Sequence, residues 1–154
     1  SHSMNTSTII EFTLHILFGL AGMIFVYAYL TALLRRDPSV RFLSAASFSA
    51  ALAFLLSWLT GGMYYLWYYG PSVKGVILGG QYTWAHAIFT EAKEHVFLFL
   101  PFLAATLYAV TALLGDRVKE SAELKRSLII LAGATLTIGI AVTLSGVLIS
   151  GAVR

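Results

Sequence analysis

Two glutamate–histidine pairs recur along this chain. Glu11 and His15 open one apolar segment, and Glu91 and His95 open another with the same internal spacing. The members of each pair are four positions apart, so on a helix the carboxylate and the imidazole lie on one face. Ionisable side chains are costly inside apolar helices and therefore mark candidate functional sites. The repeat predicts a symmetric site built from two glutamates and two histidines.

Composition places these segments in a membrane. Apolar residues make up 58% of the chain and charged residues 11%, and the mean hydropathy is +0.83, whereas soluble domains contain about 25% charged residues. Stretches longer than the roughly 20 residues that span a bilayer cover residues 9–34, 42–69, 84–114 and 127–152. The predicted fold class is an all-α integral membrane protein, a four-transmembrane-helix bundle in one domain over residues 5–154. The first four residues are expected to be an expression scar.

The repeat extends beyond the two pairs. Residues 31–34 and 111–114 share the sequence Thr-Ala-Leu-Leu, and each copy lies equally far from the Glu–His pair that precedes it. Matching leucines are common in an apolar chain, whereas a matched Glu and His are not. The bundle is therefore expected to consist of two pseudo-symmetric helical hairpins, related by an axis normal to the membrane.

Basic residues set the expected orientation. The loops after the first and third spans hold seven of them: Arg35, Arg36, Arg41, Arg117, Lys119, Lys125 and Arg126. Because cytoplasmic loops collect Lys and Arg, both termini are expected outside a bacterial-type inner membrane or plasma membrane. The net charge of +3 follows from this topology, so nucleic acid is not an expected partner. The expected partner is the lipid bilayer; a second copy of the chain and a redox partner on the outer side are further candidates.

Counting along the helices places both pairs at one depth. The length of chain from Glu11 to Arg35 is nearly the same as that from Glu91 to Arg117. At about 1.5 Å of helix per residue, the two pairs lie within roughly 3 Å of the same level. That level is near the outer edge of a hydrocarbon core about 30 Å thick, and the second span reaches it near residues 63–65. The predicted site is therefore near the outer face, where the outer ends of the first and third helices are expected to touch.

A divalent transition metal is the cofactor that these side chains favour. Two carboxylates close together in a low dielectric repel each other unless a cation lies between them. Glu11, His15, Glu91 and His95 are the predicted ligands, and carboxylate with imidazole suits iron or zinc, while the absence of cysteine argues against copper(I). A bridged pair of ions usually uses Glu-x-x-His, which is one position shorter than the spacing here. Redox, metal-handling and enzymatic roles all stay open.

Haem b is the alternative cofactor. His15 and His95 lie on separate helices and would ligate one haem iron axially, with Gly19 and Gly22 leaving space for the porphyrin. The repeated glutamates have no role in such ligation. A third hypothesis needs no cofactor: the Glu and His side chains pair across the helices as a buried polar lock.

Four further side chains are candidates for supporting the ligands. Tyr64 and Tyr65 stand at the outer end of the second span, where they belong to an aromatic belt or donate hydrogen bonds to the ligands. His86 and Glu94 lie off the Glu91/His95 face and are weaker candidates.

Small residues and one proline are predicted to shape the packing. Gly19, Gly22, Gly61 and Gly62 are expected at close approaches between helices, as small residues commonly are in membranes. Pro101 follows His95 in the same span and is expected to kink the third helix, because it removes one backbone hydrogen bond.

Overall fold

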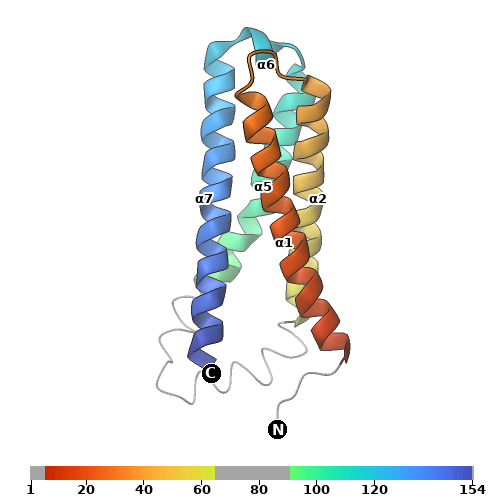
Figure 1. Ribbon diagram of the computed structural model, residues 1–154, viewed down its shortest axis with the longest axis vertical. Helices are drawn as coiled ribbons and strands as arrows, with labels where there is room; N and C mark the ends of the chain where they lie inside the picture. Colours follow the sequence, from red (N-terminus) through yellow and green to blue (C-terminus); the bar gives the residue numbers. More distant parts are fainter. Residues whose placement is uncertain (1–5, 65–90, 154) are drawn as a thin grey trace.

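A computed structural model describes the backbone of residues 6–64 and 91–153, and the side chains of residues 6–62 and 98–145. The described backbone is almost entirely helical and contains no strand (Figure 1). Its long helices are α1 (Thr6–Leu33), α2 (Val40–Tyr64), α5 (Glu91–Leu114) and α7 (Ala122–Val153), and a short helix, α6 (Arg117–Glu120), precedes α7. The predicted all-helical fold is confirmed.

Three of these helices are long and apolar enough to cross a membrane. They cover Thr6–Leu33, Val40–Gly62 and Ala122–Ser145, whereas the apolar part of α5 within the described side chains is the shorter Leu98–Leu114. Large apolar side chains are exposed on the outside of these helices, including Ile24, Phe102, Ile130 and Leu144. A helix that is apolar on all sides fits a lipid environment. The fourth span, which α5 would supply, stays a prediction.

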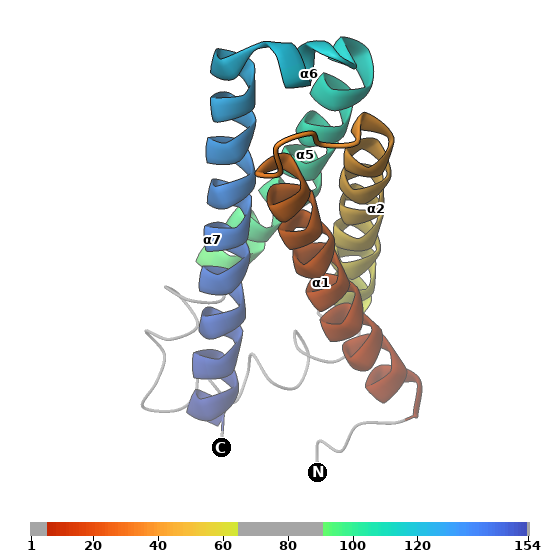
Figure 2. The ribbon, with the colours of Figure 1, turned by 45° about the horizontal axis from the view of Figure 1, so that its top comes forward.

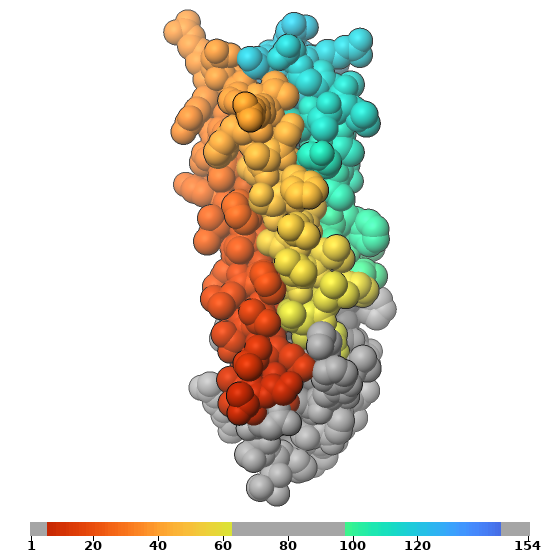
Figure 3. All heavy atoms as spheres, turned by 90° about the vertical axis from the view of Figure 1, so that its right-hand side faces the viewer, coloured from red at the N-terminus to blue at the C-terminus, as the bar shows by residue number. Residues whose placement is uncertain are grey.

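The long helices pack in a ring in which each contacts the next. α1 packs against α2, α2 against α5, α5 against α7, and α7 against α1, so α1 and α5 lie across a diagonal (Figure 2). The space-filling view shows α2 between α1 and α5 on one face (Figure 3). Side chains such as Val26, Tyr29, Phe54 and Leu107 fill the centre and are almost fully buried. This ring order is the one that two helical hairpins give.

The turn between α1 and α2 is short, as Asp37-Pro38 predicts. Ser39 begins the second helix: its Oγ accepts a hydrogen bond from the Phe42 N–H at 3.2 Å, which satisfies one donor that the first turn leaves unpaired. Ser121 does the same for α7, accepting from the Leu124 N–H at 3.2 Å. This cap explains why α7 begins before the predicted start at 127, since the polar first turn of α7 belongs to the helix.

The two basic loops lie at one end of the bundle. Lys119 Nζ is 3.4 Å from Asp37 Oδ1, and Lys125 Nζ donates to the Arg35 carbonyl at 3.3 Å. The first contact joins the α1–α2 turn to α6, and the second joins it to the first turn of α7 (Figure 1). The basic side chains of the two loops therefore share one side, as the orientation argument requires.

Glycines allow α1 and α2 to approach closely. A Cβ added to Gly22 would lie 2.6 Å from the Phe54 ring, and one added to Gly19 would lie 3.2 Å from Ser57 Oγ. Predicted close packing is thus confirmed at these two positions. Gly62 does not show such packing: it is exposed, and an added Cβ would meet none of the described residues within 4 Å.

Gly22→Ala is expected to destabilise the protein by about 1–3 kcal/mol, the usual cost of overpacking. The Phe54 ring that the new methyl group would strike is 1% exposed, so it has no open space to move into. Unfolding in detergent, followed by circular dichroism, measures the loss. The matched control is Gly133→Ala in α7, where an added Cβ meets nothing within 4 Å. That variant should be neutral or slightly stabilised, and an equal loss in both would contradict the close packing at Gly22.

α5 is helical on both sides of Pro101. The proline has no N–H, so one backbone hydrogen bond of the helix is missing. In both ribbon views, the N-terminal part of α5 leads away from the lower half of α2 and toward α7 (Figures 1 and 2). The N-terminal ends of α1 and α5 therefore diverge.

Candidate functional site

The first Glu–His pair lies on a covered face in the N-terminal half of α1. Thr8, Glu11 and His15 follow one another at helical spacing, so they form a stripe along α1. Thr8 and Glu11 are each 6% exposed, and His15 is partly buried. A buried carboxyl group and a partly buried imidazole thus lie one helical turn apart.

His15 is held by α2. Its Nδ1 lies 2.8 Å from the carbonyl oxygen of Ser57 and 3.1 Å from Ser57 Oγ, and Ser57 Oγ donates to the His15 carbonyl at 2.7 Å. A Cβ added to Gly61 would come within 2.6 Å of Nδ1. The glycine therefore leaves the space that the imidazole ring fills, which confirms the close packing predicted at Gly61.

This contact lies about one turn earlier in α2 than the sequence predicts. Counting from the arginines put the level of the site at residues 63–65, whereas His15 meets Ser57 and Gly61. The count assumes that the helices tilt alike. α1 and α2 cross at an angle (Figure 2), so residues at equal counts along the two helices do not lie side by side.

One carboxylate oxygen of Glu11 has an unusual environment. Its Oε2 is buried and has no hydrogen-bond partner among the residues that the structure describes. Leaving a buried acceptor unpaired costs about 1–3 kcal/mol, and more for a charged group. A proton or a bound cation at this oxygen removes that cost.

The second pair is described only in its backbone. Glu91, Glu94 and His95 lie in the first turns of α5, but their side chains lie outside the described residues, as does the side chain of Tyr64 at the end of α2. Two further candidates, Tyr65 and His86, lie wholly outside. Among the described side chains no group of three or more His, Cys, Asp or Glu comes together, and the predicted set of four is complete only with the α5 pair.

The backbone segments that carry the two pairs lie apart, and the meeting of their side chains stays a prediction. The N-terminal ends of α1 and α5 lie apart in both ribbon views (Figures 1 and 2), and the direct hydrogen bond between these helices is near the basic end, where Tyr29 Oη and Thr111 Oγ1 are 2.8 Å apart. Thr111 Oγ1 donates to the Leu107 carbonyl at 2.7 Å, so Tyr29 is the donor to Thr111. The N-terminal half of α1 packs on α2 at Gly19, Gly22 and Gly61. The expected contact between the outer ends of the first and third helices stays a prediction.

Gly19 and Gly22, the positions expected to leave space for a porphyrin, face α2. The α1 surface at Gly19 and Gly22 meets Ser57 Oγ and the Phe54 ring, so these glycines accommodate α2. Ser145 of α7 donates to the carbonyl of its own helix at Ala141 (2.9 Å).

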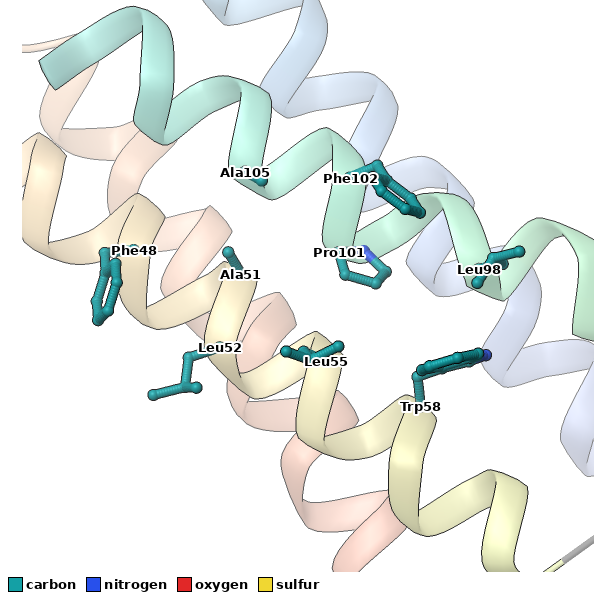
Figure 4. Close-up of a pocket in the computed structure, with 9 residues that line it drawn as sticks. All are labelled: Phe48, Ala51, Leu52, Leu55, Trp58, Leu98, Pro101, Phe102 and Ala105. Atoms are coloured by element: carbon teal, nitrogen blue, oxygen red, sulfur yellow. The ribbon is translucent and has the colours of Figure 1, made fainter. Parts of the chain in front are cut away.

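A groove of about 370 Å³ lies elsewhere, between α2 and α5. Its walls are apolar; they consist of Phe48, Ala51, Leu52, Leu55, Trp58, Leu98, Pro101, Phe102 and Ala105 (Figure 4). It opens on the face of α2 that meets α5, whereas His15 contacts the face that meets α1. The groove and the candidate ligands are therefore separate features.

These observations define a class of protein: an all-helical chain with three helices able to span a membrane and a buried carboxyl–imidazole pair on the first of them. Comparison with protein-family models, with curated proteins and with solved structures found no match to this chain. Its function must therefore follow from the chemistry of its own residues.

Proposed function

We propose that this chain is a membrane-embedded metal-binding protein with a redox or metal-handling role. Its ligands are Glu11 and His15 of α1, joined by Glu91 and His95 of α5. The observation that carries the proposal is the buried Oε2 of Glu11, which has no hydrogen-bond partner among the described residues and lies one turn from an imidazole that α2 holds in place. A cation satisfies that oxygen, and carboxylate with imidazole suits iron or zinc.

The repeated Glu–His spacing supports the α5 pair as the other half of the site. Sharing one ion requires the first turns of α5 to lie nearer to α1 than the ribbons do (Figure 1). These turns precede Pro101, where the missing backbone hydrogen bond lets a helix change direction at small cost.

The proposal includes a four-span topology with both termini and the site on the outer side of a bacterial-type inner or plasma membrane. It is supported by the basic loops at the opposite end, which the Lys119–Asp37 and Lys125–Arg35 contacts tie together, since such loops stay cytoplasmic. The site then exchanges metal or electrons with partners outside.

Elemental analysis and a visible absorption spectrum of the purified protein test the function. A stoichiometric transition metal, with no Soret band, is expected. The same measurements on His15→Ala control for metal that binds adventitiously, because that variant should lose the ion. A Soret band in the wild type would contradict a non-haem site and favour haem b with His15 and His95 as axial ligands.

Cysteine labelling tests the topology, and the chain has no native cysteine that would add background labelling. We expect a membrane-impermeant maleimide to label Ser7→Cys in intact spheroplasts, because Ser7 is exposed at the start of α1. Asp37→Cys, whose native side chain is 87% exposed in the α1–α2 turn, should react only after permeabilisation. The reverse pattern would overturn the orientation.

A structural role is the second candidate, and the His15–Ser57 hydrogen bonds favour it. Such bonds between membrane helices contribute about 0.6 kcal/mol on average. A lock of this kind would join α1 to α2 and would leave the purified protein without a stoichiometric metal. It gives no role to the buried Oε2 of Glu11, which is why the metal site is preferred.

A further inference from the structure

We infer that Ser57 and Gly61 of α2 are positioning residues that hold His15 as the Nδ1–H tautomer, so that Nε2 is the atom with which His15 binds the ion. The role of Nε2 as a metal ligand rests on the proposed function. The tautomer itself follows from the hydrogen bonds alone and stands without it.

The Ser57 hydroxyl has a single proton to donate. Ser57 Oγ lies 2.7 Å from the backbone carbonyl of His15, and a carbonyl oxygen only accepts hydrogen bonds. The hydroxyl therefore uses its proton in this bond. Ser57 Oγ presents only lone pairs to any other group.

Nδ1 of His15 consequently faces two acceptors. One is the Ser57 carbonyl oxygen at 2.8 Å, and the other is Ser57 Oγ at 3.1 Å. An unprotonated Nδ1 would direct its lone pair at oxygen lone pairs, which is repulsive. Nδ1 must therefore carry a proton, and because a neutral imidazole has one N–H, Nε2 is left as the acceptor and the possible ligand.

Gly61 keeps the ring in this position. Any larger residue would place a Cβ 2.6 Å from Nδ1 and 2.8 Å from Cε1, so the ring would have to turn out of reach of the Ser57 carbonyl. Metal-binding histidines commonly donate their other ring N–H to a backbone carbonyl, and losing such a partner costs about 10–100-fold in metal affinity. α2 thus takes part in the site although none of its described residues is a proposed ligand.

Nitrogen NMR of the metal-free protein in detergent, labelled with ¹⁵N-histidine, tests the tautomer directly. His15, assigned by the signal that disappears in His15→Gln, is expected to show a protonated Nδ1 and an unprotonated Nε2. The Nε2–H tautomer would overturn the inference. This measurement needs no metal, so it does not depend on the proposed function.

The second measurement links the tautomer to binding. Gly61→Ala should shift His15 toward Nε2–H and weaken Zn²⁺ binding by about 10–100-fold, while the neighbouring Gly62→Ala, where an added Cβ meets nothing within 4 Å, should change neither. Ser57→Ala is a milder variant, because it removes Oγ and keeps the carbonyl; it should give a smaller loss of the same kind. If Gly61→Ala and Ser57→Ala bind Zn²⁺ as tightly as the wild type, the positioning role is refuted and the proposed function is not. If the wild type shows the Nδ1–H tautomer but binds no metal, the proposed function is refuted and the tautomer is not.

Discussion

Glu11→Gln is expected to empty the proposed metal site nearly as completely as His15→Ala. The substitution keeps the size of the side chain but replaces the carboxylate, whose Oε2 is buried with no other partner among the described residues, by a neutral amide. Glu91→Gln should have the same effect, since the repeat gives Glu91 the same role. Metal per chain, measured by elemental analysis after purification, should fall to near background in each variant. In the wild type, binding should also weaken as the pH falls, because carboxylate and imidazole ligands must be deprotonated to bind.

The matched control is Glu120→Gln. Glu120 is exposed in α6, at the basic end of the bundle, and its loss should leave the metal content unchanged. If Glu11→Gln retained the metal while His15→Ala lost it, the glutamate would not be a ligand. Haem b, held by histidines alone, would then be the better hypothesis.

The helices were predictable because composition and length suffice for them. Apolar runs of more than about 20 residues predict α1, α2 and α7 as helices able to span a bilayer, and serine caps account for the starts of α2 and α7. The partners of each helix were less predictable. Gly22 indicated a close approach to another group, and the sequence allowed that group to be a porphyrin. The three-dimensional packing shows that Phe54 lies against Gly22.

The sequence marks Glu11 and His15 as candidate ligands, but it does not mark the α2 residues that contact His15. Glu11 and His15 stand out because ionisable residues are rare in this chain. Ser57 does not stand out, because hydroxyl groups in apolar helices usually bond to a carbonyl of their own helix. Thr60 and Thr106 do so here, at 2.9 Å and 2.8 Å. Ser57 is the exception that donates to α1, and the one sequence signal for it is Gly61, which lies one turn later on the same face of α2.

The two histidines of the repeat should be coupled in metal binding. If the α1 and α5 pairs share one ion, His15→Ala and His95→Ala should each abolish most of the binding. The double variant should then add little to either single loss, since residues that act on one ligand are not additive. Zn²⁺ titration of the metal-free wild type and the three variants measures the coupling free energy. Each variant must first give the wild-type circular dichroism spectrum, so that a loss of binding is not a loss of fold.

Each alternative arrangement of the two Glu–His pairs predicts a different set of Zn²⁺ affinities for the two single variants and the double variant. Partial losses that add in the double variant would mean two separate sites, which matches the divergence of α1 and α5 in the ribbons (Figure 1). Full retention of metal in both single variants would leave His15 with a structural role through its hydrogen bonds to Ser57, and the pair on α1 would then be a lock. Strong coupling would instead require the first turns of α5, before Pro101, to meet α1 when the ion is bound, because ligands of one transition metal lie within about 2.3 Å of it.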